Sequence, residues 1–193
     1  MSNDDFGSLY GEFTRDAVVE DALKADSFPT YPAGKYILKP ESVKVRHGDN
    51  EMFERLYDRP FATIKGQLLD PTTGSPIGNI FFDVSWEERR MIGKKSIKVT
   101  PDIAEDVRGE KLDRESKLWG NLEKALTGDG PKMSVGDVLE KLTKNTALLI
   151  SLQESFKLGD SWKSTKDANI RAEYVKAGAK AFNSVNTIKA MEA

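Results

Sequence analysis

The chain has 193 residues, which suits one domain with a substantial core and is too short for two large domains. Its formal net charge of −2 excludes the overall basic character of strong duplex-DNA binders, and the absence of cysteine excludes disulfides, thiolate metal sites and cysteine nucleophiles. Nine Phe, five Tyr and three Trp are too many aromatic residues for a disordered chain, so we expect it to fold.

Residues 1–30 are predicted to form an acidic N-terminal arm. They carry seven acidic and two basic side chains, a local charge of −5. Residues 16–24 predict a short helix within this arm, ended by Pro29 and Pro32. Along the chain no run reaches the roughly 18 apolar residues that span a bilayer, and no cationic start is followed by an apolar block. We therefore expect an intracellular protein with no membrane segment.

The first predicted strand covers residues 35–46. Pro40 within it indicates an edge position, a break or a bulge, because proline cannot donate to a strand ladder. Val43 and Val45 alternate with Lys44 and Arg46, which places the two basic side chains on the polar face.

Residues 60–86 predict a β-hairpin around a turn rich in Pro and Gly. On its second strand Ile80, Phe82, Val84 and Trp86 share one face, and Phe81 lies on the other. On the first strand Phe61 and Lys65 share the outer face. An apolar ring on the polar side of a strand is either covered by another part of the fold or offered to a partner.

A basic run follows the hairpin. Between residues 89 and 98 there are five basic side chains and no acidic one, namely Arg89, Arg90, Lys94, Lys95 and Lys98. Solvated surface charge is the alternative explanation of such a cluster. Residues 101–111 are predicted to be an exposed connection.

Two helices are predicted next. Asp113 caps the first, with Gly128 just past its end and an apolar stripe at helical spacing formed by Leu118, Trp119, Leu122, Ala125 and Leu126. Ser134 caps the second, whose stripe comprises Val135, Val138, Leu139 and Leu142.

The C-terminal third again alternates with a period of two. Residues 148–156 and 169–176 predict two strands, joined by a polar loop from 157 to 168 that holds Trp162. Residues 179–193 are predicted to be a helical tail, because the apolar side chains in this part recur at every third position: Phe182, Val185, Ile188 and Met191.

Enzyme signatures are missing. The single histidine, His47, precedes Gly48 and Asp49 and is interpreted as a turn residue, and no glycine loop is followed by a Walker lysine. No carboxylate pair has a spacing that calls for general acid–base roles. We therefore expect a non-enzymatic protein with no cofactor and no metal.

The order of the elements predicts an α+β, mainly β fold. Three strands, a two-helix insertion and two more strands correspond to an OB-like five-stranded β barrel, here with helical terminal arms. Residues 31–178 would form this domain.

Four stretches resemble small phage-encoded single-stranded DNA-binding proteins: residues 31–36 (YPAGKY), 78–84 (GNIFFDV), 118–122 (LWGNL) and 169–171 (NIR). The resemblance implies an OB-like core and a role in DNA replication or recombination in the cytoplasm of a host cell. Those proteins often end in an acidic, aromatic tail that recruits replication or recombination proteins. Here the acidic segment is N-terminal instead.

The sequence thus predicts a single-stranded DNA-binding protein, in which cations neutralise phosphates and exposed rings stack on bases. The expected contact residues are Lys44, Arg46, Phe61, Lys65, Phe81, Arg89, Arg90, Lys94, Lys95 and Lys98. The main alternative is a viral structural or assembly protein whose sheet face is a subunit interface, with both arms wrapping adjacent copies in a homo-oligomer. A weaker alternative is a regulatory protein whose acidic arm mimics nucleic acid.

Overall fold

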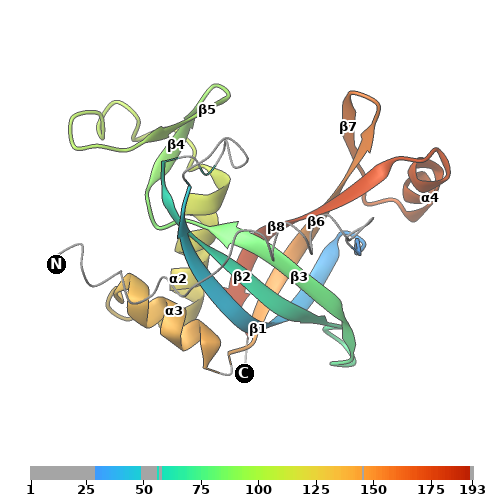
Figure 1. The fold of residues 1–193 in the computed structure, drawn as a ribbon, viewed down its shortest axis with the longest axis horizontal. Coiled ribbons are helices and arrows are strands. Elements are labelled where there is room, and N and C mark those ends of the chain that lie inside the picture. The colour runs from blue at the N-terminus through green and yellow to red at the C-terminus, as the bar shows by residue number, and fades with distance from the viewer. Residues whose placement is uncertain (1–28, 49–55, 57, 145, 192–193) are drawn as a thin grey trace.

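The computed structural model of the chain describes residues 29–48, 56, 58–144 and 146–191. Within these ranges a curled antiparallel sheet wraps around two helices, and two smaller units project from it (Figure 1). The predicted acidic arm, with its helix at 16–24, lies outside the described residues apart from positions 29 and 30.

The main sheet contains six strands, all antiparallel. Strands β3, β2, β1 and β6 are neighbours in that order, and β7 and β8 pair with opposite edges of β6. β1 and β7 lie along the same edge of β6, where β1 pairs with residues 148–152 and β7 pairs with residues 155–158. The bounds are β1 Gly34–His47, β2 Pro60–Leu69, β3 Pro76–Val84, β6 Leu148–Leu158, β7 Ser161–Ser164 and β8 Lys180–Ala190.

The predicted first strand and hairpin are confirmed as β1, β2 and β3. A β-bulge interrupts the pairing of β1 with β2 between Pro40 and Ser42, where the sequence indicates an irregularity. In β3 the side chains of Ile80, Phe82 and Val84 are buried while Phe81 is exposed, as the alternation predicts.

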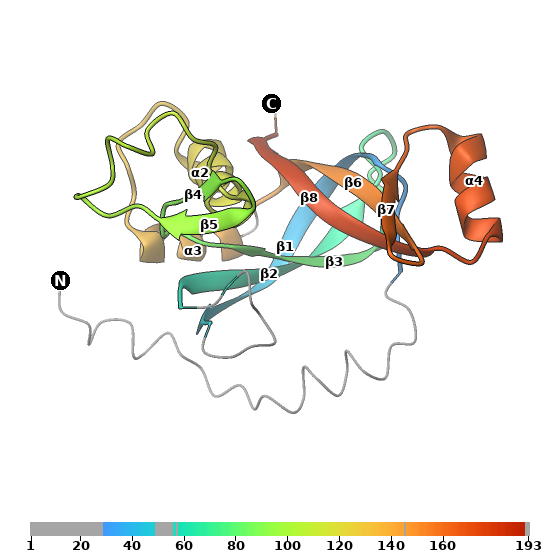
Figure 2. The ribbon, with the colours of Figure 1, turned by 90° about the horizontal axis from the view of Figure 1, so that it is seen from above.

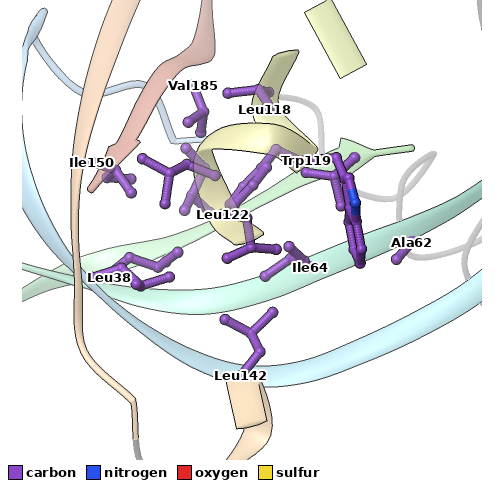
Figure 3. Close-up of a cluster of buried hydrophobic side chains, with 14 of the residues drawn as sticks. Leu38, Ala62, Ile64, Leu118, Trp119, Leu122, Leu142, Ile150 and Val185 are labelled. Atoms are coloured by element: carbon purple, nitrogen blue, oxygen red, sulfur yellow. The ribbon is translucent and has the colours of Figure 1, made fainter. Parts of the chain in front are cut away.

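The core fills the inner face of the sheet (Figure 3). Two helices, α2 (Arg114–Thr127) and α3 (Val135–Thr143), cover this face. Trp119 of α2 packs edge-on against Trp86, with ring centroids 5.6 Å apart. The core side chains that Figure 3 labels are Leu38, Ala62, Ile64, Leu118, Trp119, Leu122, Leu142, Ile150 and Val185.

Both predicted helix caps are present. The Asp113 side chain accepts a hydrogen bond from the Ser116 amide, and the Ser134 side chain accepts one from the Asp137 amide. Gly128 ends α2 with a φ of 61°, a conformation that glycine adopts at little cost. The helix bounds are therefore set by local residues that the sequence displays directly.

Tyr31 bridges the two outer strands of the curled sheet. Its backbone N–H donates to Asn183 Oδ1 on β8 at 2.6 Å, and its carbonyl accepts from Asn183 Nδ2 at 2.7 Å. Its hydroxyl donates to the carbonyl of Asn79 on β3 at 3.0 Å. Since β3 and β8 share no ladder among the described residues, Tyr31 links these edges through side-chain hydrogen bonds.

Two units project at opposite ends of the molecule (Figures 1 and 2). One is a two-stranded hairpin, β4 (Arg89–Ile92) and β5 (Lys95–Lys98), within the predicted basic run. The other consists of the ends of β6 and β8 together with β7 and the helix α4 (Ala168–Lys176). Residues 101–111 form turns, in keeping with the predicted exposed connection.

The prediction for the C-terminal third is wrong in three places. The polar loop contains the strand β7, the expected strand at 169–176 is the helix α4, and the expected helical tail is the strand β8. Asp167 caps α4 by accepting hydrogen bonds from the amides of Asn169 and Ile170. α4 buries no residue, so no apolar stripe marks it in the sequence.

A bulge explains the false helical spacing in β8. Ser151 pairs with Thr187 and Leu152 with Val185, so Asn186 is an extra residue in the ladder. Val185 and Ile188 therefore both point into the core although they are three positions apart. A bulged strand thus reproduced the spacing of a helix face.

Candidate nucleic-acid interface

The outer face of the curled sheet is rich in basic side chains. Residues that pair directly across an antiparallel ladder point to the same side, so the register identifies this face. Asp83 is an acidic member, and its Oδ1 accepts a hydrogen bond from Thr63 Oγ1 at 2.8 Å. The basic residues in the register of the face are Lys35, Lys39, Lys44, Arg46, Lys65, Lys157, Lys180 and Lys189.

The three-strand part of this face, formed by β1, β2 and β3, contains four of the ten predicted contact residues beside one another. Lys65 lies opposite Phe81 in the ladder. Lys44 lies two pairs further along opposite Thr63, and Arg46 lies two pairs beyond Lys44. Phe81 is 53% exposed. Partial desolvation and the neighbouring charges of Arg46 and Lys65 lower the pKa of Lys44. Lys44, Arg46 and Lys65 therefore form one cationic patch on the outer face, and the aromatic ring of Phe81 lies next to Lys65.

Phe61 is not part of an open surface, and its predicted role as a stacking residue is wrong. Its register places it on the outer face opposite Arg46, but it is only 1% exposed. Hydrogen bonds between Gly48 and the backbone of residues 58 and 59 join the residue after β1 to those before β2 at this end of the sheet. Leu56, in the connection between β1 and β2, is also fully buried. Phe61 is therefore an interior residue, although its register places it on the outer face of the sheet.

Most of the predicted basic run contacts neighbouring parts of the chain. Arg89 Nε pairs with Glu87 at 2.7 Å, and Lys98 Nζ pairs with the other oxygen of the same carboxylate at 2.8 Å. Arg90 pairs with Glu88 and donates to the carbonyls of Arg108 and Glu110. These contacts fold the hairpin against the following turns.

Lys94 and Lys95 differ from the rest of the run. They lie in and directly after the turn between β4 and β5 and are exposed. The remaining predicted contact residues thus form two groups. Lys44, Arg46, Lys65 and Phe81 lie on the sheet face, and Lys94 and Lys95 lie at the hairpin turn.

A buried polar cluster joins the hairpin to the rest of the fold. The Arg59 side chain is fully buried and donates to Ser85 Oγ at 3.1 Å, to Ser116 Oγ at 3.1 Å and to Asp113 Oδ2 at 2.5 Å. Ser96 of β5 donates to the same Asp113 oxygen at 2.6 Å. The cluster therefore links the start of β2, the end of β3, β5 and the N-terminus of α2. Sequence reasoning identified only the capping role of Asp113.

The pKa of Asp113 predicts how stability depends on pH. Burial alone would raise this pKa, but hydrogen bonds from Arg59, Ser96 and Ser116 outweigh it and hold the pKa below its usual value. Because the folded state has the lower pKa, this stabilisation is complete above the unfolded value of about 3.9 and is lost as the pH falls through the folded value. We expect chemical unfolding at pH 2–7 to show this loss, and Asp113→Asn to make the acid dependence less steep. Asp160→Asn, in the exposed β6–β7 turn, should leave it unchanged.

Two exposed aromatic residues that the sequence analysis did not assign to the site lie together on the outer face. Trp162 of β7 is 59% exposed and Phe182 of β8 is 43% exposed, with ring centroids 5.2 Å apart. The sequence predicts a loop at Trp162 and a helical tail at Phe182, so it gives no reason to expect contact between the two rings. Their proximity depends on β7 and β8 pairing with the two edges of β6.

A pocket of about 680 Å³ lies next to this aromatic pair. It opens where β6 is bordered by neither β1 nor β7, since the pairing with β1 ends at Leu152 and that with β7 starts at Ser155. The polar side chains that line it include Lys35, Ser151, Gln153, Glu154, Thr165 and Lys166.

Comparisons with protein families, with curated proteins and with solved structures found no match for this chain. Among the described residues, no group of three or more His, Asp or Glu side chains is arranged to hold a metal ion. None of the described helices is both long and apolar enough to span a membrane.

Proposed function

We propose that the protein is a non-enzymatic binder of single-stranded DNA, and that the outer face of β1, β2 and β3 is the binding surface. The observation that carries this proposal is the cationic patch of Lys44, Arg46 and Lys65 on one face, with the half-exposed ring of Phe81 next to Lys65. Cations along a groove or face neutralise phosphates, and aromatic rings stack on bases without regard to sequence.

The strand order supports an OB-like reading of the fold. Without β7 and the β4–β5 hairpin, five strands remain in the order β3, β2, β1, β6, β8. In chain order these strands are β1, β2, β3, β6 and β8, and both α2 and α3 lie between β3 and β6. OB folds bind oligonucleotides over the face formed by their second and third strands, which here corresponds to β2 and β3. A role in phage-type replication or recombination, with the acidic arm recruiting other proteins, belongs to the same proposal.

The first test replaces the ring in the patch. We expect Phe81→Ala to weaken binding of fluorescently labelled oligothymidylate about 5- to 150-fold at fixed salt, because stacking contributes about 1–3 kcal/mol per base. Anisotropy titration measures the affinity, and circular dichroism checks folding. Val175→Ala, which trims a similarly exposed apolar side chain on α4, away from this face, is the matched control and should bind like the wild type. Equal affinity of wild type and Phe81→Ala would reject this site.

The second test concerns the phosphate contacts. Lys65→Gln should reduce the slope of log K against log salt by about 1, since one fewer counterion is released on binding. The double variant Lys94→Gln, Lys95→Gln asks whether the β4–β5 turn also contacts the strand, and we expect a smaller slope there too. An unchanged slope in the double variant removes the hairpin from the interface and leaves the sheet face in place.

The alternative of a structural or assembly protein makes a different prediction for the same variants. A subunit interface on the sheet face would give a stable oligomer in sedimentation that Phe81→Ala dissociates, with no affinity for oligothymidylate at low salt. That combination of results would replace the DNA-binding proposal.

A further inference from the structure

The outer face of β7, β6 and β8 repeats the chemistry of the proposed site at a different place on the sheet. Lys157 of β6 pairs with Trp162 on one side and with Lys180 on the other, so these three side chains form one row. In the next row Ser155 lies between Ser164 and Phe182. The rings of Trp162 and Phe182 are thus in contact diagonally across β6, next to two lysines.

The strand β6, which lies between the two rings, is covered on its inner side. Phe156 is fully buried and its ring lies 5.3 Å from that of Tyr174 in α4. Glu154 is buried as well, and its two oxygens accept from Arg171 Nε at 2.7 Å and Nη2 at 2.9 Å. α4 therefore covers the inner face of this part of β6. Within the described residues the outer face, with Trp162 and Phe182, stays exposed.

Charge favours an anionic occupant of this surface. Residues 154–182 contain six basic and four acidic side chains, a local charge of +2. Two of the four acids are engaged within the fold, Glu154 with Arg171 and Asp167 as the cap of α4. The neighbouring pocket adds Lys35 and Lys166 together with serine, threonine and glutamine side chains, and the carboxylate of Glu154, which also lines it, is paired with Arg171. Hydroxyl, amide and ammonium donors are the groups that hold phosphate oxygens.

We propose that Trp162 and Phe182 form a second base-stacking subsite for single-stranded DNA, with Lys157 and Lys180 beside the stacked base and the pocket lined by Lys35 and Lys166 taking an adjoining phosphate. The inference rests on the proposed function and extends it, because the bound strand continues over the outer face from β3 towards β7. Two rings in contact across one intervening strand, with flanking cations, are the features of a sequence-tolerant stacking platform.

Intrinsic fluorescence gives this subsite its own signal. The chain has three tryptophans, of which Trp86 and Trp119 pack on each other at the core and Trp162 is exposed. Oligothymidylate should therefore quench the emission of Trp162. The quenching should disappear in Trp162→Phe, which keeps a stacking ring and binds with close to wild-type affinity. Trp162→Ala should bind labelled oligothymidylate about 5- to 150-fold more weakly at fixed salt.

The controls separate this inference from the proposed function. Val175→Ala removes an exposed apolar side chain from α4 on the same projecting unit and should bind like the wild type. Wild-type affinity in Trp162→Ala, or quenching that persists in Trp162→Phe, overturns the subsite, while the Phe81→Ala result still decides the proposed function. Loss of self-association in Trp162→Ala at unchanged DNA affinity also overturns it, because the pair would then be a protein contact. A wild type that binds no oligothymidylate at low salt overturns both.

Discussion

Arg59→Leu is expected to lower the free energy of unfolding by about 3–5 kcal/mol, because it leaves a buried charge without its partner. In the wild type the guanidinium of Arg59 is fully buried and pairs with Asp113, which is itself buried. Leucine removes the guanidinium donors to Asp113, Ser85 and Ser116, and the Asp113 carboxylate stays in the interior with the Ser96 hydroxyl and the Ser116 amide as its remaining donors. Urea unfolding followed by circular dichroism measures the loss.

The exposed pair between Arg108 and Glu105 supplies the matched control. Its nitrogen and oxygen are 3.5 Å apart and both side chains are exposed, so Arg108→Leu should cost less than about 1 kcal/mol. A double-mutant cycle isolates the buried pair: Asp113→Asn, which keeps a capping side chain, should cost less in the Arg59→Leu background than in the wild type. Equal costs in the two backgrounds would show that Arg59 and Asp113 are not coupled.

Gly66→Ala is expected to destabilise the fold by about 1–3 kcal/mol, the usual cost of forcing an extra carbon into a packed core. Gly66 lies on the inner face of β2, opposite Pro40 beside the bulge in β1. An added Cβ would lie 2.6 Å from the carbonyl oxygen of Lys39 and 3.0 Å from the Cα of Pro40. Both are backbone atoms, so the two strands must separate locally. Thermal and urea unfolding measure the loss.

Gly120→Ala makes the same chemical change where there is room. Gly120 is exposed on α2, and an added Cβ meets no heavy atom within 4 Å. Since alanine favours a helix over glycine, this variant should be more stable than the wild type by about 0.5–1 kcal/mol. Opposite signs for the two variants are expected, and a Gly66→Ala protein as stable as the wild type would show that β1 and β2 can move apart freely.

Prediction from the sequence succeeded where the local pattern was long and bounded by special residues. The β2–β3 hairpin alternates over nearly its whole length around a turn rich in Pro and Gly, and β1 carries Pro40 beside its bulge. The helices α2 and α3 combine an apolar stripe with capping side chains that make the expected hydrogen bonds. In these segments the pattern of burial and the local backbone chemistry indicate the same structure.

Prediction failed where burial did not follow from the local pattern. α4 buries no residue and so shows no stripe, and each strand of the β4–β5 hairpin has only four residues. In β8 the bulge at Asn186 placed two core residues three positions apart, as on a helix.

The candidate site shows the same division. Phe81 and Lys65 could be placed on the outer face from alternation alone, and the structure puts them opposite each other. Phe61 has the same alternation, yet it is buried at the end of the sheet where Gly48 is hydrogen-bonded to residues 58 and 59. Trp162 and Phe182 are 20 positions apart in elements that were predicted wrongly, and they meet only because β6 has a partner on each side.

The sequence by itself determined the mainly β character of the fold, the β2–β3 hairpin with its inner and outer faces, and the capped helices α2 and α3. These features follow from the periodicity of apolar residues and from turn and cap chemistry, which act over a few residues. Only the tertiary structure decided that Phe61 is buried, that Arg59 joins four elements and that two aromatic rings meet across β6. Whether a side chain is buried or paired depends on segments far away in the chain, and no local pattern records where those segments lie.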